Sequence, residues 1–384
     1  MGMSLRSRRY GAAVLGLTIC LTCAARETIA ADGAAKPVAG DGEPEASRPP
    51  LPPHADLSWY PAEGGARRPL RTVADWEARR RDVLTGMQAV TGEFPGNEKR
   101  VPLDVKVEAE AAVGDSVVRR TVTFATGPGR RVAAYLFLPA RGGGVAKRPA
   151  VLCLHPTGAL GKGIVAGMGD KPNRAYAIEL ARRGYVTLAP DYPTFGDYKC
   201  EFDPAEGWHS GTMRAVWDNV RAVDLLQGLP EVDGERLGAI GHSLGGHNAI
   251  FTAVFEPRIK AVVSSCGFTR FHRYYDGNLT GWTSPRYMPR IATAYGKDPD
   301  RMPFDFPELL AAIAPRAFLT VSPERDANFD VRGVRESVAE AAKIFELYGK
   351  RENLSVIYPD CAHDFPDDAR EKAYAFVDRH LGRK

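Results

Sequence analysis

The sequence has few of the residues that bind metals, and no motif for a nucleotide. Only 6 cysteines and 8 histidines occur among 384 residues. Two of the cysteines, Cys20 and Cys23, lie inside an apolar run, and no H-E-x-x-H stretch occurs. The glycine-rich stretch 158–163 lacks both the spacing and the Ser/Thr of a phosphate-binding loop. The sequence therefore implies no catalytic metal and no cofactor.

A strong net charge and a long apolar run are also lacking. The formal net charge is +4, and residues 1–30 carry four arginines against one glutamate, so the remaining chain is nearly neutral. This balance argues against nucleic acid as a partner and against an acidic membrane surface. The apolar run 11–25 is shorter than the roughly 20 residues that span a bilayer.

The N-terminus has instead the layout of a signal peptide. Arg6, Arg8 and Arg9 precede the apolar run, and small residues follow it near Ala30. We expect residues 1–30 to be removed on export, leaving a secreted or periplasmic protein with no membrane association. Residues 31–65, which include Pro49–Pro53, predict a disordered Pro/Gly-rich linker.

Residues 66–384 predict a single catalytic domain of the α/β class. A helix is expected from Thr72, then antiparallel strands between residues 101 and 138, then strands that alternate with helices. This order predicts a mostly parallel central sheet of about eight strands flanked by helices. An aromatic-rich, cap-like insertion at 267–307 follows the sixth strand. The sequence specifies neither the oligomeric state nor any pairing of Cys200, Cys266 and Cys361.

A candidate nucleophile lies in the stretch Gly241–Gly246, which matches G-x-S-x-G. The strand expected at 236–240 precedes it, and a helix is expected at 246–255. A serine on such a strand–turn–helix has an exposed hydroxyl, and its glycines permit the sharp turn. Ser243 is therefore the predicted nucleophile, and the backbone N–H of Leu244 is one predicted oxyanion donor.

A serine hydroxyl needs a general base, for which we select His363. It lies between the last expected strand and the last expected helix, where the base of such a fold is found. Four other histidines are less well placed, in the insertion, in the terminal helix or beside the serine: His272, His380, His242 and His247.

The acid that orients the base is predicted to be Asp326, in the turn after the strand 317–321. Glu324 could compete, whereas Asp330 is better explained as the cap of the following helix. The second oxyanion donor is predicted to be the backbone N–H of Thr157, in the loop after the strand 149–154. His155 in that loop could touch the substrate, although a packing role is favoured.

Residues 268–295 of the insertion contain seven aromatic residues, among them Tyr274 and Trp282. These aromatics could form a wall that stacks against a sugar or aryl group, or a small satellite core, and the sequence does not decide between the two. Four arginines could recognise an acidic sugar but are more typical of a solvated face: Arg270, Arg273, Arg286 and Arg290.

These motifs resemble exported bacterial α/β-hydrolases of the dienelactone hydrolase-like and acetylxylan esterase-like branch. The resemblance covers roughly residues 73–381 and is carried by the stretches 151–158, 183–193, 241–248 and 362–365. Dienelactone hydrolases use cysteine where this chain has Ser243, which argues against dienelactone as substrate. The resemblance implies a serine esterase acting on small-molecule or carbohydrate esters, plausibly of the acetylxylan type.

Two other functions are compatible with the motifs. A peptidase of the prolyl-oligopeptidase type shares the G-x-S-x-G stretch, but such enzymes have a large N-terminal propeller and the segment before Val151 is too short for one. A non-catalytic binding module on a hydrolase fold would have no physical need for Ser243, Asp326 and His363 together.

Overall fold

The structure is a computed structural model that describes residues 54–61, 66–140, 147–200, 202 and 207–382. All of these residues belong to one compact unit, residues 49–384. The expected signal peptide and most of the expected linker lie outside the described residues. Among the residues described, none of the helices combines the length and the apolar character needed to cross a membrane.

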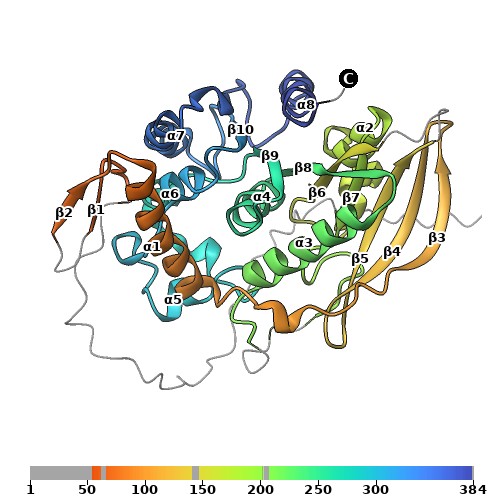
Figure 1. Ribbon diagram of the computed structural model, residues 1–384, viewed down its shortest axis with the longest axis horizontal. Coiled ribbons are helices and arrows are strands. Elements are labelled where there is room, and N and C mark those ends of the chain that lie inside the picture. Colours follow the sequence, from red (N-terminus) through yellow and green to blue (C-terminus); the bar gives the residue numbers. More distant parts are fainter. Residues whose placement is uncertain (1–53, 62–65, 141–146, 201, 203–206, 383–384) are drawn as a thin grey trace, which may run out of the picture. The chain divides into compact units, whose positions relative to one another are not determined.

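A nine-stranded sheet forms the centre of the unit, in the order β11-β10-β9-β8-β6-β7-β5-β4-β3 (Figure 1). The six strands from β11 to β7 run parallel, and β5, β4 and β3 continue the sheet antiparallel. This is the expected α/β architecture, with nine strands in place of about eight. The strands are β3 Lys106–Val113, β4 Val117–Gly127, β5 Arg130–Pro139, β6 Arg148–Leu154, β7 Val186–Pro190, β8 Val232–His242, β9 Ile259–Ser265, β10 Ala317–Val321 and β11 Leu354–Ile357.

Helices cover both faces of the sheet. On one face α2 and α8 pack against alternate residues of the strands, and on the other α3, α4 and α7 do so (Figure 1). Burial on both faces explains why the central strands are continuous apolar runs. The α-helices are α1 Val73–Thr91, α2 Tyr176–Arg182, α3 Gly211–Gly228, α4 Leu244–Phe255, α5 Arg290–Thr293, α6 Phe306–Ala311, α7 Val331–Leu347 and α8 Asp367–Leu381.

Helix α1 begins where the sequence predicts. Thr72 is its N-cap, and the side chains of Thr72 and Asp75 each accept a hydrogen bond from the other's backbone N–H. The predicted apolar face, which includes Trp76 and Met87, is buried. The guanidinium of Arg79 on the same helix pairs with the buried carboxylate of Glu308 on α6 at 2.8 Å, and this buried pair fixes α1 to the core.

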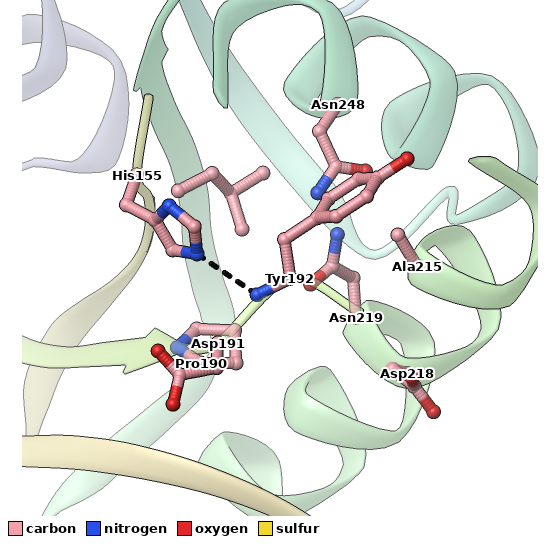
Figure 2. A pocket seen from close by; sticks show the side chains of 9 residues that line it. His155, Pro190, Asp191, Tyr192, Ala215, Asp218, Asn219 and Asn248 are labelled. Carbon is pink, nitrogen blue, oxygen red and sulfur yellow. Dashed lines mark hydrogen bonds between the residues drawn. The ribbon is translucent and has the colours of Figure 1, made fainter. Parts of the chain in front are cut away.

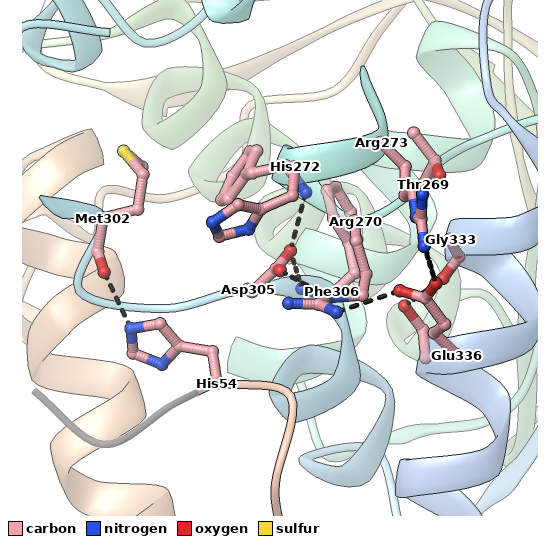
Figure 3. Close-up of polar contacts among 12 residues, drawn as sticks. His54, Thr269, Arg270, His272, Arg273, Met302, Asp305, Phe306, Gly333 and Glu336 are labelled. Carbon is pink, nitrogen blue, oxygen red and sulfur yellow. Dashed lines mark hydrogen bonds and ion pairs between the residues drawn. The ribbon is translucent and has the colours of Figure 1, made fainter. Parts of the chain in front are cut away.

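Part of the segment expected to be linker is structured. Residues Trp59–Pro61 (β1) pair antiparallel with Arg67–Pro69 (β2). His54 lies 2.8 Å from Glu308 through Nδ1 and 2.7 Å from the backbone oxygen of Met302 through Nε2, the second contact being drawn in Figure 3. His54 therefore anchors this segment to α6 and the chain before it.

The insertion consists of short turns around an aromatic core. Phe268, Phe271 and Trp282 are buried in the same cluster as the residues of α4 and α6. Short helical turns occur here and elsewhere in the unit: η3 Asn97–Lys99, η4 Ile164–Met168, η5 Pro172–Arg174, η7 Phe271–Gly277, η8 Leu279–Trp282, η9 Pro299–Arg301 and η10 Arg351–Asn353. The insertion is therefore part of the hydrophobic core and not a separate lobe.

Candidate active site

Ser243 occupies the sharp turn between β8 and α4. Its backbone has φ 55° and ψ −120°, a conformation that side-chain-bearing residues rarely adopt. The turn is held because the N–H of Ser243 donates to the backbone oxygen of Ser265, on the neighbouring strand β9, at 2.8 Å. A strained residue fixed in this way is typical of a functional site.

The positions of Gly241 and Gly245, on either side of Ser243, leave no room for a side chain. A Cβ at Gly245 would lie 1.9 Å from the backbone oxygen of Leu154, and a Cβ at Gly241 would lie 2.1 Å from the backbone oxygen of Gly245. No side chain fits at either position without moving the backbone. The motif therefore reflects a packing constraint as well as the turn itself.

The structure brings together the three residues predicted from the sequence. His363 Nε2 lies 2.9 Å from Ser243 Oγ, and His363 Nδ1 lies 2.8 Å from Asp326 Oδ2. The imidazole side chain is 30% exposed, whereas that of Asp326 is 1% exposed. One ring nitrogen thus faces the serine hydroxyl and the other faces a buried carboxylate, which is the arrangement that general-base activation requires.

Asp326 is held by its own loop. Its Oδ1 accepts hydrogen bonds from the backbone N–H groups of Asn328 and Phe329, at 2.8 and 3.1 Å. Only Oδ2 remains to face His363. Backbone donors therefore fix the orientation of the carboxylate and compensate its burial.

The competing acids are engaged elsewhere. Glu324 forms an ion pair with Arg335 on α7. Asp330 is the N-cap of α7, as expected, because it accepts a hydrogen bond from the N–H of Arg332. Neither carboxylate takes the place of Asp326 beside His363.

The histidines that flank the serine are buried and neutral. Burial lowers the pKa of His247 to about 3, and its ring lies 4.1 Å from the ring of Phe251. Burial, with Arg174 and His363 nearby, holds the pKa of His242 well below its ordinary value. His272 pairs with the exposed Asp300. His363 is therefore the histidine placed to serve as base.

The two predicted oxyanion donors lie at the turn and in the loop after β6. Leu244 is the first residue of α4, and the N–H groups of a first helical turn have no acceptor within the helix. Thr157 is exposed in the loop after β6, and its hydroxyl lies 3.4 Å from the hydroxyl of Tyr287 in the insertion. Their role as oxyanion donors remains a prediction.

His155 positions this loop. Figure 2 shows its Nε2 accepting a hydrogen bond from the N–H of Tyr192, at 2.9 Å, and its Nδ1 lies 2.7 Å from the backbone oxygen of Pro156. Burial lowers the pKa of the ring. Both nitrogens are occupied by backbone groups, which favours packing over contact with substrate.

Tyr274 and Trp282 are connected to His363 through the ring of Phe329. Both are buried, and their rings lie 5.9 and 6.0 Å from the ring of Phe329, which lies 5.9 Å from the ring of His363. The burial of these two rings favours the satellite core over the stacking wall as their role. Phe329, in the acid loop, was not singled out by the sequence because a lone phenylalanine carries no local signal.

Two of the four arginines singled out in the insertion pair with carboxylates. Arg270 pairs with Asp305 and Glu336, and Arg273 pairs with Glu336, as Figure 3 shows for this group. Arg286 donates to the hydroxyl of Thr194. Arg290 donates to the backbone oxygen of Ala89. Carboxylates therefore engage Arg270 and Arg273, the two arginines nearest α7, and not Arg286 or Arg290.

Cys266 is an unpredicted neighbour of the predicted site. Its Sγ and one ligand atom each of Asp326 and His363 lie within 4.8 Å of one another, so the three could hold a metal ion. Burial, together with the charge of Asp326, raises the pKa of the thiol well above its ordinary value, and the thiol donates to the backbone oxygen of Asp364. The four described cysteines, including Cys153 in the core and Cys361 two residues before His363, are free.

Comparisons with known proteins point in one direction. A family profile described as "Glucuronyl esterase, fungi" matches residues 206–349, a span that includes Ser243 and Asp326 and ends before His363. YtaP of Bacillus subtilis, whose name assigns it to the hydrolases, is 26% identical over 244 residues, which are 61% of this chain and 79% of YtaP.

Solved structures of esterases share the fold. A glucuronoyl esterase from Solibacter usitatus superposes with a TM-score of 0.66 at 20% identity, covering 88% of this chain and 100% of that chain. Acetyl xylan esterase 1 from a Thermoanaerobacterium species superposes with a TM-score of 0.52 at 19% identity, covering 77% of this chain and 97% of that chain. At these identities the likeness establishes the fold.

Proposed function

Because the chain belongs to the α/β-hydrolases, we propose that it is an exported serine hydrolase that cleaves carboxylic esters of carbohydrates. The observation that carries the proposal is the hydrogen-bonded series of Ser243, His363 and Asp326 on the strained turn after β8. The names of the similar proteins, which are esterases of glucuronoyl groups and of acetylated xylan, support a carbohydrate ester as the substrate.

The first half of the reaction forms an acyl-enzyme. The oxygen of Ser243 attacks the ester carbonyl carbon while Nε2 of His363 takes the hydroxyl proton, and Asp326 stabilises the imidazolium through Nδ1. The N–H groups of Leu244 and Thr157 are the proposed donors to the carbonyl oxygen as it gains negative charge. His363 then returns the proton to the oxygen of the leaving alcohol.

The second half releases the acid. Water attacks the acyl carbon, His363 takes a proton from that water, and the same proton returns to Ser243 as the acyl–oxygen bond breaks. Buried, neutral His242 and His247 exchange no proton in this scheme, because burial holds the pKa of each well below neutrality. One base therefore serves both halves.

Two kinds of sugar ester fit this scheme. In one the sugar supplies the alcohol of the ester, and in the other it supplies the acid. Acetate release from acetylated xylan would leave the sugar as the alcohol. Release of methanol from a methyl-esterified glucuronic acid would leave the sugar as the acid. The family profile and the larger TM-score of the glucuronoyl esterase favour including the second substrate beside the first.

The test is product release from a panel of esters by the wild type and by Ser243→Ala. The panel contains an aryl acetate, acetylated xylan and methyl glucuronate. Serine-dependent release of acetate or methanol from either sugar ester is the expected result. Activity confined to the aryl ester would overturn the carbohydrate part of the proposal, and full activity of folded Ser243→Ala would overturn the mechanism. N-terminal sequencing of the exported protein tests removal of residues 1–30.

A further inference from the structure

A cleft of about 430 Å³ borders the loop that carries Asp326. One wall is the end of η7 in the insertion, and the other is the acid loop with the first turn of α7, residues 324–332. The cleft therefore lies between two segments that the sequence separates by some fifty residues. Of its lining residues, only Asp326 takes part in the catalytic steps proposed above.

Tyr275 is the unusual residue of this cleft. Its side chain belongs to the few large apolar groups exposed among the described residues, at 56%. Its hydroxyl donates to Oδ1 of Asn328, in the opposite wall, at 3.0 Å, and its ring meets the buried ring of Tyr274 edge-on at 4.8 Å. The ring is thus held in place at both ends although most of its surface faces water.

The backbone at this point is strained. Tyr275 has φ 45° and the next residue, Asp276, has φ 54°, so two successive side-chain-bearing residues are left-handed. Such strain is concentrated at ligand clamps and active sites. Tyr275 does not belong to a buried cluster, whereas its neighbour Tyr274 does. The turn thus places one tyrosine in the core and presents the next at the cleft.

The guanidinium groups of the cleft have carboxylate partners. Arg332 pairs with Asp330, and Arg273 pairs with Glu336. The carboxylates of Asp276 and Glu324 also line the cleft. Three guanidinium groups, of Arg273, Arg325 and Arg332, face four lining carboxylates, so a polyanion would meet more carboxylates than guanidinium groups. A neutral ligand rich in hydroxyl groups fits better, because carboxylates accept from hydroxyls, guanidinium groups donate to them, and an aromatic face packs against sugar C–H groups.

The cleft and the reacting groups share one rigid loop. Asp326 lines the cleft and also faces His363. The ring of Phe329, three residues on, contacts both the ring of His363 and the ring of Tyr274, each at 5.9 Å. A glycan held against Tyr275 would therefore be positioned relative to His363 through packed side chains.

We propose that this cleft is a glycan-binding subsite, in which Tyr275 stacks against a neutral sugar unit of the chain that carries the ester. The inference rests on the proposed carbohydrate esterase function and adds where the remote part of such a substrate binds. Because this contact lies away from the reacting carbonyl, it lowers KM and leaves the chemical step unchanged.

The first test compares an acetylated xylo-oligosaccharide with 4-nitrophenyl acetate. Tyr275→Ala should raise KM for the oligosaccharide about three- to tenfold, the loss expected for one aromatic contact, and leave 4-nitrophenyl acetate unaffected. Tyr275→Phe keeps the ring and should stay near the wild type. Val107→Ala, at a similarly exposed residue of the edge strand β3, is the matched control. Equal effects on both substrates, or none on the oligosaccharide, would overturn the subsite.

The second test measures binding without turnover. Folded Ser243→Ala is titrated by calorimetry with unesterified xylo-, manno- and cello-oligosaccharides, alone and combined with Tyr275→Ala. Binding of one of them that weakens with Tyr275→Ala supports the subsite, and absence of binding to all three overturns it. If the wild type cleaves sugar esters and Tyr275→Ala does so equally well, the subsite is overturned and the proposed function stands. A wild type that cleaves only aryl esters would overturn the function.

Discussion

The carboxylate of Asp191 accepts a hydrogen bond from the backbone N–H of Lys162 at 2.7 Å and pairs with the ammonium group of the same residue at 2.6 Å. Burial disfavours the charge of Lys162, but Asp191 and Asp197 outweigh it and raise the pKa of Lys162. A Cβ at either Gly161 or Gly196 would come within 2.2 Å of Asp191. The carboxylate of Asp191 therefore fixes the position of the loop after β6, which contains Thr157.

Asp191→Asn should damage both stability and catalysis. It leaves the buried ammonium of Lys162 with Asp197 alone, and breaking a buried pair costs about 3–5 kcal/mol of unfolding free energy. We expect kcat to fall by up to about 100-fold if the N–H of Thr157 moves, since one oxyanion donor is worth about that much. Asp197→Asn, at the exposed partner, should cost less than about 1 kcal/mol. Equal melting temperatures for the two variants would contradict this ranking.

Ser243→Ala should reduce kcat by at least about 10⁴-fold, because no other hydroxyl contacts Nε2 of His363 among the described residues. Labelling by a fluorophosphonate probe should disappear with it. Ser337→Ala, which removes another buried serine hydroxyl, on α7, is the control and should retain activity and labelling. Labelling that persists in Ser243→Ala would place the nucleophile elsewhere.

Asp326→Asn should reduce kcat about 10⁴-fold with little loss of fold, since the amide keeps its place but no longer holds the imidazolium. Asp330→Asn, four residues on, changes a helix cap to an equally good one and should leave hydrolysis of an aryl acetate nearly unchanged. The comparison needs only initial rates and circular dichroism spectra. Similar losses in both variants would contradict the separate roles assigned to the two carboxylates.

Gly245→Ala should abolish activity through packing alone. The added methyl group would lie 1.9 Å from the backbone oxygen of Leu154, so α4 must move away from β6 and carry the N–H of Leu244 with it. Gly228→Ala, at a glycine whose Cβ would meet open space, is the matched control. Soluble yield, melting temperature and aryl acetate hydrolysis measure the effect, and a fully active Gly245→Ala would show that the turn is less crowded than described.

Stability should fall as the pH rises past neutrality, through His54. Burial favours the neutral imidazole, but the carboxylate of Glu308 outweighs burial and raises the pKa of His54 above its ordinary value of 6.5. The resulting stabilisation is fully present below pH 6.5 and is lost as the pH rises through the raised pKa. The wild type should therefore exceed His54→Gln in melting temperature most at low pH, with the gap closing above neutrality. A gap that is constant with pH would exclude this linkage.

Local sequence signals were sufficient to place several residues of the site. Ser243 is predictable because its turn needs glycines within a few residues, and Asp326 and His363 are predictable because they follow strands at the carboxyl edge of a parallel sheet. Helix α7 begins where predicted, since Asp330 caps an apolar-periodic run. Each of these predictions depends on neighbours that are close along the chain or on the order of elements.

Contacts between distant segments could not be predicted in this way. His54 meets Glu308 across 254 residues, and Tyr275 meets Asn328 across 53. The exposure of Tyr275 could not be predicted either, because the neighbouring aromatics Tyr274 and Trp282 of the same stretch are buried. Only the fold decides which aromatics of one stretch face the core and which face water.

The turn at Ser243 has no hinge. It is bonded to β9 through its own N–H, crowded against β6 at Gly245 and continuous with α4. We therefore expect Ser243 to keep its geometry as long as the sheet is folded. During heating, the loss of esterase activity should coincide with the melting of the sheet. The hydrolysis rate would then measure the folded fraction of the protein.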